Sequence, residues 1–155
     1  ESLCREALKG LRETLGSRHP HTLMYINNLG MLLKAKGDLA AAEPLCREAV
    51  EGQRETLGNR HPGTLNSIGN LGGLLHTKGD LAAASPLLRE ALEGQRETLG
   101  DQHPDTLISI KRLDRLLQAK GKLRPAEKYF FPRSAIGIRA RFAPRGALVA
   151  PSVGC

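Results

Sequence analysis

Tryptophan is absent from this sequence of 155 residues, and phenylalanine and tyrosine together supply only 3% of it, although apolar residues make up an ordinary 40%. A core of normal size must therefore be built from Leu, Ile and Ala, a composition typical of stacked helices. No apolar run approaches the roughly 20 residues that a membrane-spanning helix needs. The start of the chain also lacks the basic and then apolar segments of a secretory signal. We therefore expect an all-α protein without a membrane span.

Cysteines at short local spacing are also absent. Cys4, Cys46 and Cys155 lack the spacing of a disulfide framework or a zinc site. Cys4 and Cys46 stand at equivalent places in a repeating pattern whose third copy has Leu88, so this place is predicted to be a buried apolar slot. The pattern favours a reducing, cytoplasmic location, and we expect neither a metal nor a cofactor.

Acidic residues are scarce towards the C-terminus. Residues 1–110 contain 12 Lys and Arg against 14 Asp and Glu, whereas residues 111–155 contain 11 against 2. A basic segment can attract nucleic acid, an anionic membrane or an acidic peptide. Because no aromatic residues are interleaved with the basic ones and no nucleic-acid motif is present, a nucleic acid is disfavoured as the partner.

What the sequence does contain is a pattern that returns every 42 residues. Leu-Gly occurs at 15–16, 57–58 and 99–100, His-Pro at 19–20, 61–62 and 103–104, and Thr-Leu at 22–23, 64–65 and 106–107. A fixed period of about 20–50 residues predicts a stacked array of one supersecondary unit. We expect the array over residues 1–131, with a half repeat (2–16), two repeats (17–58 and 59–100) and a degenerate repeat (101–131), followed by a basic, disordered tail (132–155). Because the chain opens on half a repeat, we expect it to begin inside a longer parent.

Each unit is predicted to contain two helices. The first helices are expected over about Pro20–Lys36, Pro62–Lys78 and Pro104–Lys120, and the second over about Leu39–Leu57 and Leu81–Leu99. Proline is favoured at the first helical position, and a glycine that can accept a left-handed backbone follows each helix. Asp38 and Asp80 are predicted to cap the second helices. The short loops make consecutive helices antiparallel neighbours.

Apolar residues lie at helical spacing along the first helices. They are Leu23, Ile26, Leu29 and Leu33 in one unit and Leu65, Ile68, Leu71 and Leu75 in the next. Gly30 and Gly72 interrupt these helices at equivalent places, at a cost of about 1 kcal/mol each relative to alanine. The usual reason for such a glycine is the close approach of a neighbouring helix, and Ala42 and Ala84 are the small residues predicted to face them.

These residues resemble those of a known family. Leu-Gly at 29–30 and 71–72, KGDLAAA at 36–42 and 78–84, and REAV and REAL at 47–50 and 89–92 are similar to the tetratricopeptide repeat. The 42-residue period with LGxxHPxTL resembles its kinesin-light-chain type. The resemblance implies a right-handed superhelical solenoid of antiparallel helix pairs that acts as a protein-interaction scaffold. The third unit departs from it, with Asp114 in place of a glycine and Pro125 early in its last helix.

Units 17–58 and 59–100 differ at 11 of 42 positions, and six of these differences fall at 24, 25, 27, 31, 34 and 35. All but position 25 fall on one face of the first helix, opposite the copied apolar stripe. In tetratricopeptide arrays this face lines the concave groove where peptides bind. The alternative interpretation is that the differences accumulated freely after duplication because the face is solvated. The predicted groove residues are Met24, Asn27, Asn28, Met31, Lys34, Asn66, Asn70, His76, Lys111, Arg112, Arg115 and Gln118, together with Gly69, Gly73 and Ile108.

The groove residues predict a peptide ligand with an apolar part and an acidic part. Asparagine can donate and accept hydrogen bonds along an extended backbone, and Lys111, Arg112 and Arg115 favour carboxylates, which arginine can bind with two hydrogen bonds. Resemblance to the kinesin-light-chain type likewise implies acidic peptides with an aromatic anchor. The five-residue carboxylate clamp of chaperone-binding tetratricopeptide proteins is matched only by Asn70 and Arg112, so that subclass is disfavoured.

No catalytic arrangement accompanies the repeats. Each His-Pro histidine lies in the same loop of a different unit, too far from its copies to share a metal, so we expect these residues to serve helix entry. The Arg- and Glu-rich segments at 47–55 and 89–97 are expected to form a solvated face with spaced ion pairs. We expect a non-enzymatic scaffold for a partner protein or peptide. The alternatives are a structural spacer within a larger multidomain protein and the sensor arm of a longer ATPase or hydrolase.

Overall fold

The computed structural model describes residues 2–121 of the chain. Within them the helices are α1 (Ser2–Leu15), α2 (Pro20–Ala35), α3 (Leu39–Leu57), α4 (Pro62–Lys78), α5 (Leu81–Leu99) and α6 (Pro104–Ala119). The prediction of an all-α fold is confirmed, and the predicted helices in this range end within one residue of their expected positions. None of the described helices is long and apolar enough to cross a membrane. The expected second helix of the third unit and the expected tail at 132–155 lie outside the described residues.

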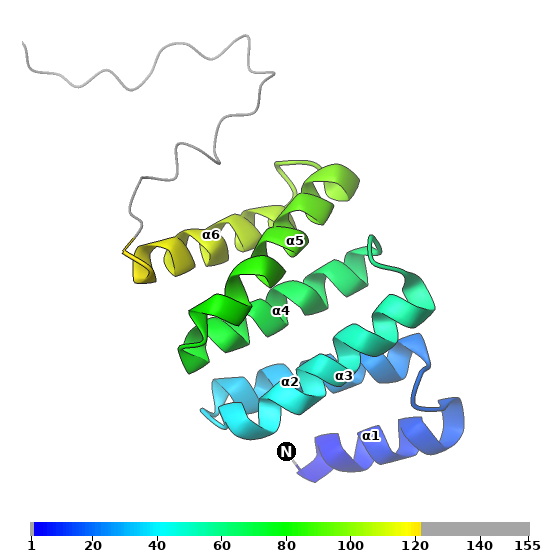
Figure 1. The fold of residues 1–155 in the computed structure, drawn as a ribbon. Coiled ribbons are helices and arrows are strands. Elements are labelled where there is room, and N and C mark those ends of the chain that lie inside the picture. Colours follow the sequence, from blue (N-terminus) through cyan, green and yellow to red (C-terminus); the bar gives the residue numbers. More distant parts are fainter. Residues whose placement is uncertain (1, 122–155) are drawn as a thin grey trace, which may run out of the picture.

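Consecutive helices run antiparallel and stack into an array of two layers (Figure 1). The main packing is of α2 against α3 and of α4 against α5, while α3–α4 and α5–α6 contacts join one unit to the next. The first helices also contact one another, α2 against α4 and α4 against α6. These three helices therefore form one layer, and α1, α3 and α5 form the other. This arrangement of helix pairs is the predicted solenoid.

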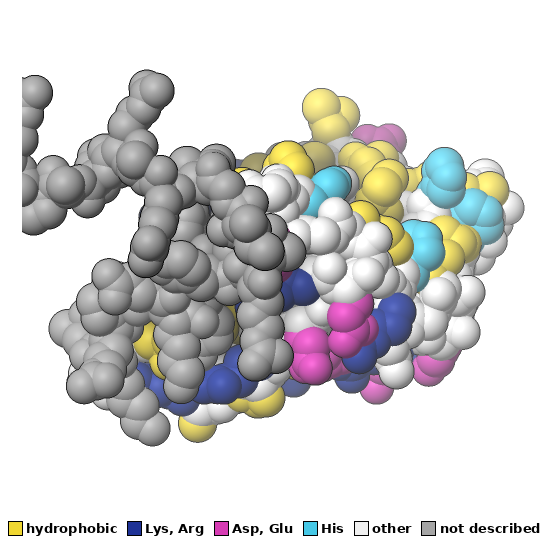
Figure 2. Space-filling view, turned by 90° about the horizontal axis from the view of Figure 1, so that it is seen from above, with side chains coloured by type: hydrophobic (Ala, Val, Ile, Leu, Met, Phe, Trp, Pro, Cys, Tyr) yellow, Lys and Arg dark blue, Asp and Glu magenta, His cyan; other side chains and the backbone are white. Residues whose placement is uncertain are grey.

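Histidine side chains cap the first helices. The Nδ1 atoms of His19, His61 and His103 accept hydrogen bonds from the backbone N–H group two residues later, at 3.2, 3.0 and 3.2 Å. The prediction that the His-Pro pairs serve helix entry is therefore confirmed. Figure 2 shows histidine side chains gathered on one side of the molecule. Among residues 2–121, no group of three or more His, Cys, Asp or Glu side chains is placed to hold a metal ion.

The turns inside each unit depend on an aspartate and a glycine. Asp38 and Asp80 each accept a hydrogen bond at 3.0 Å from the backbone N–H three residues later, as predicted for N-terminal caps. Gly37 and Gly79 precede them with φ values of 87° and 91°, in the left-handed region that glycine adopts without strain. Short-range interactions therefore position both helices of a unit.

The apolar stripe predicted for the first helices forms the core. Its side chains are at most 3% exposed: Leu23, Ile26, Leu29 and Leu33 in α2 and Leu65, Ile68, Leu71 and Leu75 in α4. The equivalent places in α6 hold Leu107, Ile110, Leu113 and Leu117, of which Leu113 is buried and the other three are half-buried. The neighbouring Leu116 is also buried. The core is therefore continuous along the array.

The mid-helix glycines accept a close neighbour, as predicted, but the nearest atoms belong to Cys46 and Leu88 and not to Ala42 and Ala84. A Cβ on Gly30 would lie 2.6 Å from Sγ of Cys46, and a Cβ on Gly72 would lie 2.8 Å from Cγ of Leu88. Cys46 and Leu88 are fully buried, which confirms the apolar slot predicted from the repeat. Burial raises the pKa of the Cys46 thiol to about 11, so at neutral pH it is protonated and packs as a small apolar side chain.

A second glycine contact was not anticipated from the sequence. A Cβ on Gly52 of α3 would overlap the Leu23 side chain of α2, and a Cβ on Gly94 of α5 would overlap Leu65 of α4. The equivalent glycine of α1, Gly10, would place its Cβ more than 4 Å from any such neighbour. Each complete helix pair is therefore joined by a leucine that packs onto a glycine of the partner helix.

Ion pairs connect the second helices of successive units. Arg12 of α1 contacts Glu48 of α3, and Arg54 of α3 contacts Glu90 of α5, both with an N–O distance of 2.7 Å. The sequence predicted ion pairs on this solvated face, and the structure shows that these two span 36 residues and cross from unit to unit. Exposed pairs of this kind contribute at most about 1 kcal/mol each, so they set the register of the units more than they stabilise them.

Candidate binding face of the first helices

The predicted groove residues within the described range all lie on α2, α4 and α6, whose joint outer surface we call the first-helix face. The exposed ones are Met24, Asn28, Asn66, Ile108, Lys111, Arg115 and Gln118. The half-buried ones are Met31, Lys34, His76 and Arg112, and the buried ones are Asn27, Gly69, Asn70 and Gly73. The structure therefore divides the predicted set into a solvated part and a part that belongs to the packing between helices.

A chain of side-chain hydrogen bonds crosses the three first helices. Arg112 of α6 donates from Nη2 to Oδ1 of Asn70 on α4 at 2.8 Å. The Asn70 amide in turn donates to Oδ1 of Asn66 at 3.1 Å and to Oδ1 of Asn27 on α2 at 3.4 Å. Asn27 and Asn70 are only 7% and 8% exposed. Asn70 thus uses its polar atoms inside the protein, where it orients the Arg112 guanidinium.

Two buried glycines of α4 lie beside this chain of hydrogen bonds. Gly69 and Gly73 stand where α2 has Asn27 and Met31. A Cβ on Gly69 would lie 3.1 Å from Nη1 of Arg112. A Cβ on Gly73 would lie 3.5 Å from Nζ of Lys34 and 3.7 Å from Nε of Arg112. The two cationic side chains, which we call the Lys34–Arg112 pair, therefore approach the same point over α4 from opposite neighbours.

The Lys34–Arg112 pair is electrostatically uncompensated within the described part of the chain. Burial lowers the pKa of Lys34, and the positive charge of Arg112 lowers it further. Burial also lowers the pKa of Arg112, while the negative charge of Asp105 acts in the opposite direction. Neither cation has a carboxylate within ion-pair distance among residues 2–121. A half-buried cation without a counter-charge is unfavourable, because it loses hydration without gaining an ion pair.

The other predicted residues have no hydrogen bond to this network within residues 2–121. Gln118 donates to Oδ2 of Asp114 at 2.8 Å, one turn earlier on α6. Met24 and Ile108 leave 51% and 45% of their surface exposed, which makes them the apolar components of the first-helix face. Lys111 and Arg115 are exposed on α6 and add positive charge near Arg112.

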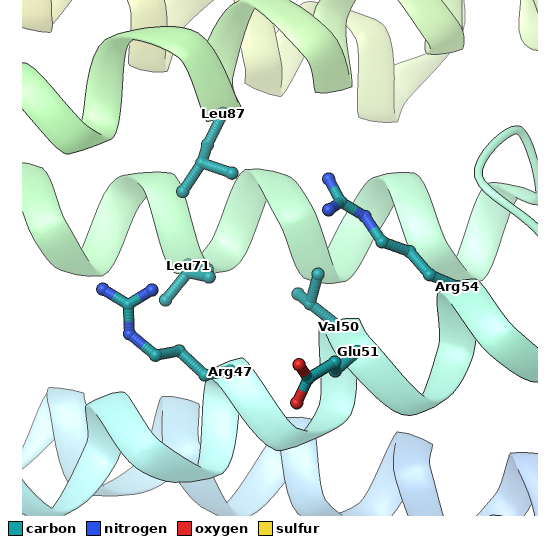
Figure 3. Close-up of a pocket in the computed structure, with 6 residues that line it drawn as sticks. All are labelled: Arg47, Val50, Glu51, Arg54, Leu71 and Leu87. Atoms are coloured by element: carbon teal, nitrogen blue, oxygen red, sulfur yellow. The ribbon is translucent and has the colours of Figure 1, made fainter.

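Three depressions on the opposite layer were not predicted from the sequence. One has a volume of about 240 Å³ and is formed by α3 residues facing Leu71 of α4 and Leu87 of α5 (Figure 3). We call it and its two equivalents the outer pockets. Their linings follow the 42-residue period: Arg47, Val50, Glu51 and Arg54 in this one, Arg5, Leu8, Lys9 and Arg12 in the second, and Arg89, Leu92, Glu93 and Arg96 in the third. The arginines repeated at this spacing are the only sequence signal that could have indicated them.

The outer pockets lie at the seams between units. Arg12 and Arg54, which line two of them, are already paired with Glu48 and Glu90. Their cationic groups are therefore compensated within the protein, unlike the Lys34–Arg112 pair. This contrast makes the first-helix face the stronger candidate for binding.

Comparison with known proteins identifies a family that matches this chain. The tetratricopeptide repeat family matches residues 22–97 and 70–130. The comparison with curated proteins gave no match.

Three solved structures with the same architecture are 30%, 30% and 22% identical to this chain. One, from Podosopora anserina, is described as a kinesin light chain with nearly identical TPR-like repeats; it is 30% identical, with a TM-score of 0.72 over 78% of this chain. A substituted variant of the same protein gives 30% identity and a TM-score of 0.73. The chain spans 57% of the length of both. The structure of BtubC (BKLC) from P. vanneervenii is 22% identical, with a TM-score of 0.74 over 98% of this chain and 63% of its own length, and it supports the fold alone.

Proposed function

This chain belongs to the tetratricopeptide repeat family, whose domains generally mediate protein–protein interactions, and from this premise we propose that it is a non-enzymatic scaffold for an acidic segment of a partner protein. The segment binds along the first-helix face, across α2, α4 and α6. Repeats of this type are typically non-catalytic.

The observation that carries this proposal is the uncompensated Lys34–Arg112 pair. All three first helices contribute to it, because Arg112 on α6 is oriented by Asn70 on α4 and meets Lys34 from α2. An acidic side chain of a partner supplies the missing counter-charge, and a charge-assisted hydrogen bond to arginine is among the stronger polar contacts in proteins. Lys111 and Arg115 extend the positive charge along α6.

The apolar part of the partner is expected at the exposed apolar residues of the same face. Met24 and Ile108 lie on α2 and α6, on either side of the central helix. Exposed methionine adapts to different partner side chains, because it is unbranched and polarizable. A segment that combines acidic residues with an aromatic or aliphatic anchor therefore fits the face.

The first experiment is a binding screen of the full chain by fluorescence anisotropy. Labelled peptides rich in Asp and Glu, with and without an aromatic anchor, are titrated at low and at physiological salt. We expect selective binding that weakens as salt rises, because exposed charges are screened. Absence of binding at every salt concentration would contradict the proposal and favour a structural spacer.

A charge-reversal variant locates the bound peptide. We expect Lys111→Glu with Arg115→Glu to weaken acidic-peptide binding by about tenfold or more while leaving helicity by circular dichroism unchanged. The matched control is Lys9→Glu with Arg89→Glu, which makes the same change in charge on α1 and α5. Loss of binding in the control alone would place the partner at the outer pockets and overturn the assignment of the first-helix face.

The spacer alternative is favoured by one observation. The ion pairs from Arg12 to Glu48 and from Arg54 to Glu90 repeat between units, as expected of an array whose purpose is to hold a fixed spacing. The peptide screen separates the two functions, since a spacer needs no ligand on its first-helix face.

A further inference from the structure

We propose that the Lys34–Arg112 pair, which packs over Gly69 and Gly73 of α4, is a site for one doubly charged oxyanion, the phosphoryl group of a phosphorylated partner segment. This inference rests on the proposed function, since the phosphoryl group is carried by the segment that binds along the first-helix face.

The site depends on two positions of α4 that have no side chain, Gly69 and Gly73. The equivalent positions of Gly69 and Gly73 are Asn27 and Met31 in α2, and Lys111 and Arg115 in α6. Neither glycine has the positive φ that would require it, and a glycine inside a helix is less favourable than alanine by about 1 kcal/mol. The atoms nearest to a Cβ on Gly73 are those of Lys34 and Arg112, which reach it from α2 and α6. The missing side chains therefore let the two cationic side chains pack onto α4 and lie close to each other.

The spacing of the two cations suits one oxyanion. Nζ of Lys34 and Nε of Arg112 lie 3.5 and 3.7 Å from the same point above Gly73. That point is a Cβ position on α4 and cannot itself hold a ligand, but it shows that the two cationic groups are no farther apart than the sum of these two distances. Charge-assisted hydrogen bonds are about 2.8 Å long, so one oxyanion with several acceptor oxygens can bridge both groups. Arg112 uses Nη2 for its bond to Asn70, and its Nε and Nη1 remain for the ligand.

The guanidinium is held in place before any ligand arrives. Asn70 accepts from Arg112 and donates to Asn27 and Asn66, so the orientation of Arg112 is determined by side chains of two other helices. A preorganised donor loses less conformational freedom on binding than a mobile surface arginine. Asn70 is thus a positioning residue for the site.

The two positive charges of the Lys34–Arg112 pair favour a phosphoryl group over a single carboxylate. The pair carries two positive charges, and no described residue neutralises either one within ion-pair distance. A phosphoserine or phosphothreonine carries about −1.5 to −2 charges at pH 7 and three acceptor oxygens, whereas one Asp or Glu carries a single charge. Lys111 and Arg115 on the same face increase this preference for the more highly charged group.

The test compares three degenerate peptide mixtures that differ only in a fixed central residue, which is serine, phosphoserine or glutamate. Each is titrated against the full chain by fluorescence anisotropy. We expect the phosphoserine mixture to bind about tenfold more tightly than the serine mixture, and more tightly than the glutamate mixture. Equal binding of the glutamate and phosphoserine mixtures would overturn the phosphoryl assignment.

Three substitutions test whether the preference for phosphoserine depends on the Lys34–Arg112 pair, and a fourth substitution is the control. Lys34→Gln and Arg112→Gln are expected to remove the preference for phosphoserine, and Arg115→Gln, with the same change in charge on α6, is expected to keep it. Gly73→Met introduces the residue that α2 has at this position and should also remove the preference, with helicity by circular dichroism unchanged. A phosphoserine preference that survives Lys34→Gln, Arg112→Gln and Gly73→Met would overturn the site.

The outcomes for the proposed function and for this site are distinguishable. If acidic peptides bind but phosphoserine gives no preference, the scaffold function stands and the phosphoryl site is wrong. If no peptide binds, the proposed function fails, and inorganic phosphate decides the remaining question. Broadening of the ³¹P resonance of phosphate that disappears in Lys34→Gln would then support the anion site, and absence of broadening would overturn it.

Discussion

The α2–α3 unit and the α4–α5 unit are identical at 31 of 42 positions, and two groups among their 11 differences lie in different parts of the unit. Inside the apolar core the changes are modest: Cys46 corresponds to Leu88, and Val50 to Leu92, all of them nearly inaccessible. On the first-helix face the changes are large, and Met31 corresponds to Gly73. Positions in the apolar core are constrained by close packing, whereas the first-helix face can acquire new chemistry. The comparison separates the residues that hold the array together from those that can distinguish partners.

The largest effect is expected from breaking the packing stripe. Leu71→Ala should lower the free energy of unfolding by about 2–5 kcal/mol, because it leaves a cavity at a side chain that is 3% exposed. The measurement is urea unfolding followed by far-UV circular dichroism. Met24→Ala, on the same kind of helix but 51% exposed, is the control and should change stability by less than about 0.5 kcal/mol. Equal changes in the free energy of unfolding would show that the buried apolar stripe and the exposed first-helix face are wrongly distinguished.

An intermediate effect is expected at the second-helix glycines. Gly52→Ala should destabilise the array by about 1–3 kcal/mol, because the new methyl group would overlap Leu23. Gly10→Ala, at the equivalent place in α1, should instead stabilise it by up to about 1 kcal/mol, since alanine favours helix and no neighbour lies within 4 Å. Thermal unfolding of both variants tests the opposite signs. Stabilisation by Gly52→Ala would mean that the leucine-on-glycine contact is absent.

The smallest effect is expected at Glu43, which corresponds to Ser85 in the next unit. Its carboxylate accepts a hydrogen bond from Lys78 at 2.7 Å and pairs with Arg47 at 2.8 Å, and these two cations hold the pKa of Glu43 below its usual 4.5. Because the folded pKa is lowered, the stabilisation is fully present above pH 4.5 and is lost as the pH falls through the folded pKa.

Glu43→Ser therefore should lower stability by less than about 1 kcal/mol at neutral pH. The difference from the unmodified chain should shrink as the pH falls below 4.5. Urea unfolding of both proteins over this pH range measures the difference, and one that grows towards low pH would contradict the sign derived from the pKa.

Helix positions were predictable because their signals are local. Proline at Pro20 and Pro62, the caps at Asp38 and Asp80, and a glycine after each helix act over a few residues of chain, and the structure confirms each helix of the described range to within one residue. The buried stripe was predictable for the same reason, since it follows from helical spacing. The close approach at Gly30 followed from the cost of a mid-helix glycine.

The candidate site was predictable only in part. Lys34, Asn70 and Arg112 were predicted as groove residues on the first helices, but their hydrogen bonds and mutual approach were not predicted. Asn27 and Asn70 were expected to contact a peptide, and the structure shows both buried and hydrogen-bonded within the protein. Burial of a polar side chain on a variable stripe depends on how far the neighbouring helix leans over it, which the pattern of one helix does not contain.

The sequence by itself determined the unit, its 42-residue period and the ends and buried sides of its helices, because these depend on interactions within about one helical turn or on simple periodicity. The tertiary structure decided which residues meet across units: Arg112 with Asn70, Lys34 with Gly73, and Arg54 with Glu90. The two hydrogen-bonded pairs among them join residues 42 and 36 apart in the chain. Their meeting depends on the rotation and tilt of each helix against the next, and side-chain packing across the whole array sets both.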